Sequence, residues 1–476
     1  MGLFSRKDKT PKGEQPINTS KSNVSVNSHS SSLRSPPGVS RNPLNRTSAA
    51  STSPGTPMSP MSPIKLPKID LPRPPDPQLD PAGYLRSLGA VRERSKIVTD
   101  KALRNELKHF DVDMGKFPDV VTFVTGIIKH FCVGGRDRIA QLLSTWPDNV
   151  DNTERCRRLI DLFLISVLLD AGAGTQWSYK SNENGRMYRR SEGIAVASLE
   201  MFKTFQVDKD GLKDLTVEKL AAGLQSRPGN EIAGVEGRTD LLVRLGEAMA
   251  AKDDFFGFDG RPGSIVDHLL GHPSTQASSM LIVPLPVLWN VLMTGLSPIW
   301  PTNRTAINGV SLGDAWPCQS MPQPGNSPKV SAFPNSSNAA AWESILPFHK
   351  LTQWLTYSLM QPMQQLLKMH FAGTELLTGL PEYRNGGLFV DMGVLNLKKD
   401  DLERGLENYN DWVRRTGAKG VEVAPMFEPS DDIIVEWRGV TVGFLDMLCT
   451  EVNKALKSEL GGNEMTLAQL LEAGWS

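Results

Sequence analysis

The sequence has few cysteines, and their spacing does not indicate a disulfide framework. Its 476 residues contain four of them, Cys132, Cys156, Cys318 and Cys449, and none belongs to a CxxC pair. Disulfide networks and thiolate zinc sites need closely spaced cysteines, so neither is expected, and a reducing compartment is favoured. The zinc-protease sequence HExxH, the dinucleotide sequence GxGxxG and the P-loop are also absent, so these three functions have no support.

Excess charge and long apolar runs are missing as well. Lys and Arg total 52, as do Asp and Glu, whereas nucleic-acid-binding proteins usually carry a basic excess. The longest apolar stretches, around 159–169 and 281–296, are shorter than the roughly 20 residues of a membrane-spanning helix. No secretory signal follows the N-terminus. We therefore expect a soluble cytoplasmic protein that binds neither nucleic acid nor membrane, with the nucleus as the alternative location.

Residues 1–80 have a composition of their own. They hold 14 of the 34 prolines and 15 serines, and they carry 11 basic against 5 acidic side chains. Such a segment buries too little apolar surface to offset the entropy lost on ordering it, so we expect a disordered tail. Five Ser-Pro or Thr-Pro pairs between residues 35 and 63 favour proline-directed phosphorylation. A tail without regulation is the alternative.

From Pro81 onward the spacing of apolar residues is mostly that of helices. Helical patterns cover 81–107, 157–169, 190–205, 212–225, 238–251, 262–271, 344–372, 400–416 and 431–458. Strand patterns are confined to 280–283 and 421–423. Residues 312–340 are rich in Pro, Ser and Asn, which predicts a flexible insert. We expect one large, mainly α domain over residues 81–476.

The apolar helix over 157–169 leads directly to Asp170 and a turn of small residues, Ala171 to Gly174. Small residues let a ligand approach the backbone, and a carboxylate at such a poorly solvated helix end is a candidate catalytic group. Trp177 and Tyr179 follow as candidate binding residues. In the alternative interpretation, Asp170 caps the next segment and the glycines only make the turn.

Two further clusters combine polar side chains with helical spacing. Arg190 and Glu192 lie at the start of an Ala-rich helix, where Arg190 would pair either with a ligand or with a structural carboxylate. His349 and Gln353 are spaced i, i+4 and share a helix face that would hydrogen-bond a polar ligand. No second histidine lies at metal-binding spacing, so no metal site is expected. A satisfied structural histidine is the alternative.

The densest polar run is residues 377–391, which is bounded by Pro and Gly. It contains Glu382, Tyr383, Arg384, Asn385 and Asp391. Burial of such groups in a loop would perturb their pKa values, which makes this run a strong site candidate. Further along, Glu436 and Arg438 flank Trp437 near a helix start, where they would serve either a ligand or an internal ion pair.

Together these runs resemble the uracil catabolism protein four family of fungi and bacteria, over roughly residues 81–476. The runs are SLGAVRERS (87–95), SVLLDAGAG with a following W-x-Y (166–179), RSEGIAVAS (190–198), PFHKLTQWLTYSL (347–359), LTGLPEYRNGGLFVD (377–391), VEWRGVTV (435–442) and MTLAQLLE (465–472). The resemblance implies a place in uracil degradation through ribosylated intermediates that end in ribosylurea. It attaches no chemical step to the family.

A more distant resemblance suggests the reaction. Queuosine-salvage nucleosidases, which resemble helix-hairpin-helix DNA glycosylases, have a similar order of features. Their aspartate before a small turn is similar to Asp170, their acidic-Tyr-Arg run to residues 382–384, and their Val-Glu-x-Arg run to residues 435–438. This resemblance implies a helical fold and an N-glycosidase that hydrolyses an N-ribosidic bond. Its substrate would be a small ribosylated product of pyrimidine breakdown, and it would need no metal or organic cofactor.

Such a reaction assigns roles to the candidate residues. Positive charge develops at the anomeric carbon and negative charge on the leaving nitrogen, and urea is a poor leaving group that needs a hydrogen-bond donor or a general acid. The expected roles are a carboxylate beside the sugar (Asp170), pocket walls (Trp177, Tyr179), holders of the leaving amide (His349, Gln353), a 5′-phosphate ligand (Arg384) and partners of the ribose hydroxyls (Glu382, Asp391).

The chain differs from the resembled family in two main places. A stretch that supplies His, Ser, Arg and Trp residues is missing between Ile128 and His130, and the C-terminus stops before the usual Gly/Arg/Pro-rich ending. An incomplete gene model would explain both differences, and they put the activity of this chain in question. The alternative function is therefore a non-catalytic protein of the same pathway, which binds a metabolite or another pathway enzyme.

Overall fold

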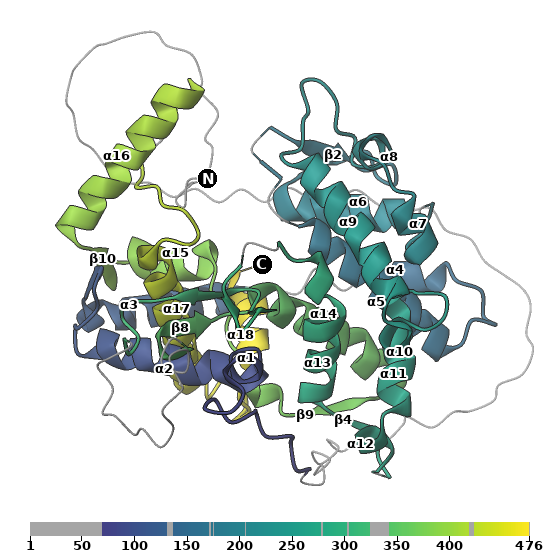
Figure 1. Ribbon diagram of the computed structural model, residues 1–476, viewed down its shortest axis with the longest axis horizontal. Helices are drawn as coiled ribbons and strands as arrows, with labels where there is room; N and C mark the ends of the chain where they lie inside the picture. Colours follow the sequence, from purple (N-terminus) through teal and green to yellow (C-terminus); the bar gives the residue numbers. More distant parts are fainter. Residues whose placement is uncertain are drawn as a thin grey trace, which may run out of the picture. The chain divides into compact units, whose positions relative to one another are not determined.

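A computed structural model of the chain describes residues 69–475, apart from 131–136, 171–172, 175, 205, 278, 302–303, 324–341 and 418–422. The expected tail up to residue 68 and most of the expected insert lie outside these residues. The described residues form one compact unit, which is mainly helical with strands of two or three residues. The prediction of a mainly α fold is thus confirmed (Figure 1).

The α-helices are α1 (Pro81–Leu85), α2 (Leu88–Leu103), α3 (Phe117–His130), α4 (Asp137–Ser144), α5 (Asn152–Leu169), α6 (Arg190–Phe202), α7 (Lys209–Lys213), α8 (Val217–Gly223), α9 (Val235–Ala250), α10 (Asp253–Phe256), α11 (Ile265–Gly271), α12 (Pro273–Gln276), α13 (Leu285–Gly295), α14 (Lys350–Leu367), α15 (Tyr383–Asp391), α16 (Lys399–Thr416), α17 (Asp432–Ala455) and α18 (Leu467–Trp475). Short 3₁₀ turns are η1 (Met114–Lys116), η2 (Pro262–Ser264), η3 (Ser297–Ile299), η4 (Trp342–Ser344) and η5 (Thr374–Leu376).

The strands pair two by two. Antiparallel pairs join β1 (Phe110–Val112) to β10 (Leu395–Leu397), β2 (Ser178–Lys180) to β3 (Met187–Arg189), β5 (Ala306–Ile307) to β6 (Val310–Ser311), and β7 (Ala315–Pro317) to β8 (Ile345–Pro347). A parallel pair joins β4 (Ile282–Pro284) to β9 (His370–Ala372). The strand expected at 280–283 corresponds to β4. The start of the expected insert contains β7, so that part belongs to the folded body.

The two largest hydrophobic clusters of the described residues hold most of the long helices together. The first is built around α5, α6, α9, α13 and α14, and the second around α2, α3, α15 and α17. α5 packs against α14 in the first cluster, and α2 packs against α17 in the second (Figure 1). Leu164 and Leu359 are fully buried in the first cluster, as is Val440 in the second. Truncating one such residue to alanine typically costs about 2–5 kcal/mol.

The segment just before α14 differs from the predicted helix. A helix was expected from residue 344, but Ile345–Pro347 forms β8, and α14 begins only at Lys350. Pro347 has no N–H to donate, and the backbone turns sharply at His349 before the helix starts. This turn positions several of the predicted site residues.

No helix in the described part of the chain combines the length and apolar character that crossing a bilayer requires.

Candidate functional site

An ion pair inside the protein joins α17 to the segment before β7. The Nη1 and Nη2 atoms of Arg438 donate to the two carboxylate oxygens of Asp314 at 2.9 and 2.8 Å. The Nε of Arg438 donates to the carbonyl oxygen of Pro381 at 3.1 Å. Its guanidinium carbon also lies 4.0 Å from the centroid of the Phe348 ring. A bidentate pair stacked on an aromatic ring has a fixed geometry, so it holds these segments together.

Asp314 also fixes the start of α14. Its main-chain oxygen accepts hydrogen bonds from the amides of Phe348 and His349 at 2.9 and 3.2 Å, and its carboxylate accepts one from the Lys350 amide at 3.0 Å. These bonds hold His349 at φ 46°, a left-handed conformation that is uncommon for residues other than glycine. Burial alone would raise the pKa of Asp314, but the charge and hydrogen bonds of Arg438 outweigh burial and hold this pKa well below its usual range.

Glu382 and Lys350 form a second, looser ion pair, which we call the Glu382–Lys350 pair. Lys350 Nζ lies 3.5 Å from Glu382 Oε2, and the side chains keep 29 % and 23 % exposure, respectively. Glu382 is the N-cap residue of α15, where the helix dipole favours a carboxylate. Lys350 Nζ lies 5.3 Å from the centroid of the Trp354 ring. A pair at this distance is beyond ideal hydrogen-bond length, so a polar ligand could replace either partner.

His349 and Gln353 are interior residues, so the prediction that they offer a polar face to a ligand is wrong. His349 is 2 % exposed, and its Nε2 lies 2.8 Å from the carbonyl oxygen of Leu85. Burial lowers the pKa of His349, which favours the neutral imidazole. Gln353 is fully buried, and both ends of its amide are hydrogen-bonded to Thr378. The Gln353 amide and the Nε2 of His349 are therefore used inside the protein.

The run 377–391 is a turn followed by a helix, whereas its Pro and Gly residues predicted a polar loop. α15 begins at Tyr383, and the side chains of Tyr383 and Arg384 are exposed. Asn385 is buried and donates to the carbonyl oxygen of Leu380 at 2.7 Å, which closes the turn. Tyr383 and Arg384 therefore stay available to a ligand, and Asn385 does not.

Asp391 is exposed at the far end of this helix. At 1.5 Å rise per residue, the nine residues from Glu382 to Asp391 span about 13 Å along the helix axis. A ribose ring is much smaller than this span. This span does not favour both carboxylates on one ribose, and the role of Asp391 stays a prediction.

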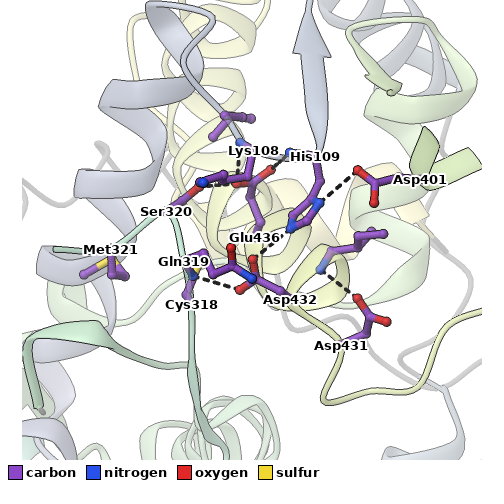
Figure 2. Close-up of polar contacts among 12 residues, drawn as sticks. Lys108, His109, Cys318, Gln319, Ser320, Met321, Asp401, Asp431, Asp432 and Glu436 are labelled. Atoms are coloured by element: carbon purple, nitrogen blue, oxygen red, sulfur yellow. Dashed lines mark hydrogen bonds and ion pairs between the residues drawn. The ribbon is translucent and has the colours of Figure 1, made fainter. Parts of the chain in front are cut away.

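Glu436 anchors the backbone, contrary to its predicted contact with substrate. Its buried carboxylate accepts hydrogen bonds from the amides of Lys108 and His109 at 2.9 and 2.8 Å, and from the Ser320 hydroxyl (Figure 2). Hydrogen bonds of this kind compensate a carboxylate for the loss of water. Arg438, which was also predicted to contact substrate, forms an internal ion pair, but its partner is Asp314 and not Glu436.

His109, whose amide is bonded to Glu436, lies between two helices. Its Nδ1 is 2.9 Å from Asp401 of α16, and its Nε2 is 2.8 Å from Asp432 of α17 (Figure 2). Burial disfavours the imidazolium, but the hydrogen bonds to Asp432 and Asp401 outweigh it and raise the pKa of His109 to about 9. At neutral pH His109 is therefore charged and ties α16 to α17.

Asp170 ends α5 and meets the start of α6. Its Oδ1 accepts a hydrogen bond from the Ser191 hydroxyl at 3.0 Å. Arg238 donates to the carbonyl oxygen of the neighbouring Leu169 at 2.8 Å. Burial lowers the pKa of Arg238, and the negative charge of Asp170 opposes this shift. Residues 171–172 lie outside the described residues. The role of Asp170 beside a sugar stays a prediction.

Trp177 and Tyr179 are core residues, contrary to the expectation that they wall a pocket. They are 0 % and 2 % exposed. The indole Nε1 of Trp177 donates to the carbonyl oxygen of Leu224 at 2.9 Å, and the Tyr179 hydroxyl donates to Glu200 at 3.0 Å. Both polar groups are therefore used inside the protein.

Arg190 and Glu192 are exposed on the first turn of α6. Arg190 also has a positive φ of 54°. Their predicted contact with substrate is not tested by this placement and stays a prediction.

Sequence reasoning did not single out Asp314, Lys350 or His109. Asp314 falls in a stretch whose Pro, Ser and Asn content suggested a flexible insert, so its composition hid it. Lys350 directly follows His349, a predicted site residue, in the run PFHKL. This position next to His349 is the sequence feature that could have indicated Lys350. His109 has acidic residues at helical spacing, Glu106 and Asp113, but its partners in the fold are Asp401 and Asp432 of distant helices, so local spacing did not identify it.

Other suggestive features lie elsewhere. A polar cavity of about 390 Å³ is lined by residues that include Asp161, Lys209 and Arg261, which are not among the predicted site residues. The run Gly309–Gly313 reads G-x-S-x-G, but Ser311 lies in an exposed two-stranded hairpin and not in the strand-to-helix turn of a hydrolase nucleophile. The described residues contain no group of three or more His, Cys, Asp or Glu side chains that could hold a metal ion.

Comparison with known proteins places this architecture in a family. Residues 84–476 match the family described as "Protein of unknown function (DUF1688)". The chain is 38 % identical over 427 residues to "Uracil catabolism protein 4" of Lachancea kluyveri, which covers 83 % of this chain and 92 % of that protein. It is 40 % identical over 418 residues to "Protein urg3" of Schizosaccharomyces pombe, which covers 82 % of this chain and 90 % of that protein. The chain therefore belongs to the DUF1688 family, as a homologue of these two fungal proteins.

Proposed function

We propose that this protein acts in uracil catabolism by hydrolysing the N-ribosidic bond of a ribosylurea-type intermediate, which releases urea. The name of the L. kluyveri relative supports the pathway. The Glu382–Lys350 pair supports the reaction, because it places two opposite charges 3.5 Å apart with both side chains accessible.

The chemistry needs this combination of charges. As the ribosyl–nitrogen bond breaks, positive charge builds at the anomeric carbon and negative charge on the leaving nitrogen. A carboxylate stabilises the first charge or activates water, and a cation or proton donor stabilises the second. Glu382 is the carboxylate that we assign to this role, because Asp314 and Glu436 are already engaged by the protein.

Two neighbours of Glu382 remain available for binding. Tyr383 and Arg384 are exposed on the first turn of α15. If the substrate carries a 5′-phosphate, Arg384 suits it, because a guanidinium binds phosphate with two parallel hydrogen bonds. Asp170 is a second candidate carboxylate, and no residue in this scheme requires a metal or organic cofactor.

The test compares two acidic residues that each pair with a lysine. Glu382→Gln keeps the shape of the side chain and removes its charge, so urea release should fall about 10²–10³-fold. Glu403 pairs with Lys399 at 3.8 Å on the exposed face of α16, and Glu403→Gln is the matched control, with activity expected to be unchanged. Equal activity of Glu382→Gln and the native protein would remove Glu382 from the reaction.

The alternative is a non-catalytic protein of the same pathway that binds the metabolite or another pathway enzyme. It predicts that ribosylurea binds, as measured by calorimetry, while no urea appears over many hours. Binding without turnover would favour this alternative over hydrolysis.

A further inference from the structure

We propose that Lys350 is a catalytic residue, which protonates the leaving urea nitrogen and recovers its proton through Glu382. This inference rests on the proposed hydrolysis and adds to it a proton donor that the sequence did not identify. Two observations support it. Several polar groups of this cluster are unsuited to donate a proton, and the fold holds Lys350 beside Glu382.

Three other polar groups of this cluster are unsuited to donate this proton. His349 is 2 % exposed, is bonded to Leu85, and has its pKa lowered by burial. Gln353 is fully buried against Thr378. Arg438 is committed to Asp314, and a guanidinium does not give up its proton in proteins. Among the described residues of this cluster, Lys350 and Tyr383 combine access to solvent with a donor that can lose a proton. Lys350 is the one that forms an ion pair with Glu382.

A hydrogen bond of its own main-chain amide holds Lys350 in place. Its amide donates to the carboxylate of Asp314 at 3.0 Å, and the Arg438–Asp314 pair also holds the Pro381 carbonyl, one residue before Glu382. Both partners of the Glu382–Lys350 pair are thus fixed to one anchor. The Lys350 ammonium lies 5.3 Å from the centroid of the Trp354 ring and 3.5 Å from Glu382, while 29 % of its side chain stays exposed.

The bond between the anomeric carbon and nitrogen breaks, its electron pair goes to nitrogen, and the Lys350 ammonium gives that nitrogen a proton to form neutral urea. Water attacks the anomeric carbon and loses a proton to the Glu382 carboxylate. Glu382 then returns this proton to the Lys350 amine across their 3.5 Å contact. The sum is ribosylurea plus water giving ribose plus urea, with both side chains restored and no oxidant, reductant or co-reactant required.

A comparison of two substrates tests this role. Ribosylurea needs its leaving group protonated, whereas 4-nitrophenyl riboside releases a stable phenolate that does not. The variant Lys350→Met keeps a long unbranched side chain and removes the ammonium, and Lys350→Arg keeps the charge with a poor proton donor. The matched control is Lys399→Met, which removes an exposed lysine that also pairs with a glutamate. Thermal melting of each variant reports whether it folds.

The expected result is selective. Both Lys350 variants should lose about 10²–10⁴-fold in kcat on ribosylurea, the usual range for general-acid catalysis, and less than about tenfold on 4-nitrophenyl riboside. Lys399→Met should match the native protein on both substrates. Glu382→Gln should lose activity on both, because both reactions need the carboxylate.

Two results would overturn the inference while leaving the proposed hydrolysis intact. Equal losses on both substrates in the folded Lys350 variants would assign Lys350 to substrate binding or structure. Normal activity of Lys350→Met on ribosylurea would remove it from the reaction. If the native protein cleaves neither substrate, the proposed function itself fails, and the role of Lys350 fails with it.

Discussion

Removal of either Arg438 or Asp314 would leave the other as an uncompensated charge. We expect Asp314→Asn to lower the free energy of unfolding by about 2–3 kcal/mol. This is less than the cost for a fully buried pair, because the Asp314 side chain keeps 30 % exposure. Urea denaturation of both proteins at neutral pH measures the difference.

This difference should depend on pH in a defined direction. Because the pKa of Asp314 is held below its unfolded value, its contribution is present above about pH 4 and is lost as the pH falls further. The gap between native protein and Asp314→Asn should therefore narrow below about pH 4. A gap of constant size from neutral pH down to about pH 3 would contradict the ion-pair account.

His109 should stabilise the protein in the opposite pH range. Its folded pKa of about 9 exceeds the usual histidine value of about 6.5, so its contribution is complete below about pH 6.5 and is lost as the pH rises through about 9. We expect His109→Gln to cost about 2–3 kcal/mol at pH 6 and much less above about pH 9. Unfolding curves across this range measure both values, and a cost that does not change with pH would contradict the prediction.

The two interpretations of Asp170 differ in which quantity changes. If Asp170 stabilises charge in the transition state, Asp170→Asn should lower turnover about 10²–10³-fold with little change in KM. If it is only a cap, the change should cost about 1 kcal/mol of stability and leave turnover intact. Ser191→Ala is the control, because it removes the hydrogen bond to Asp170 and keeps the charge.

At the scale of elements, α2 and α17 are brought together by glycine. A Cβ on Gly443 of α17 would lie 2.0 Å from the Oγ1 of Thr99 on α2, so any side chain there displaces a buried neighbour. We expect Gly443→Ala to destabilise the protein by about 1–3 kcal/mol despite the better helix propensity of alanine. Thermal and chemical unfolding measure the change.

Gly89 is the matched control on α2. A Cβ at Gly89 meets nothing within 4 Å, so Gly89→Ala should stabilise the protein by up to about 1 kcal/mol. A neutral or stabilising Gly443→Ala would show that α2 and α17 do not approach as closely as described.

Periodicity predicted the long helices well, because one buried face repeats along each. α17 was expected at 431–458 and spans Asp432–Ala455, and α16 was expected at 400–416 and spans Lys399–Thr416. The helix expected from residue 344 was wrong at its start, because β8 is fixed by pairing with a strand some 30 residues away. Composition also misplaced Asp314 in a flexible insert, because pairing between distant segments leaves no local pattern.

At the scale of the whole molecule, five of the seven runs that carried the family resemblance fall into two groups of contacts. The runs at 347–359, 377–391 and 435–442 meet through Asp314, Arg438 and Glu382. The runs at 166–179 and 190–198 meet through Asp170 and Ser191. Residue type alone indicated these runs as candidates for a site. It did not predict which side chains face inward, because this depends on contacts such as those that bury His349, Gln353 and Glu436.

The most direct test of the account is the product formed by the native protein. Purified full-length chain is incubated with ribosylurea, and free urea and free ribose are measured over time. The account predicts that both appear in equal amounts, at a rate that falls about 10²–10³-fold in Glu382→Gln. Binding of ribosylurea without any release of urea would contradict it.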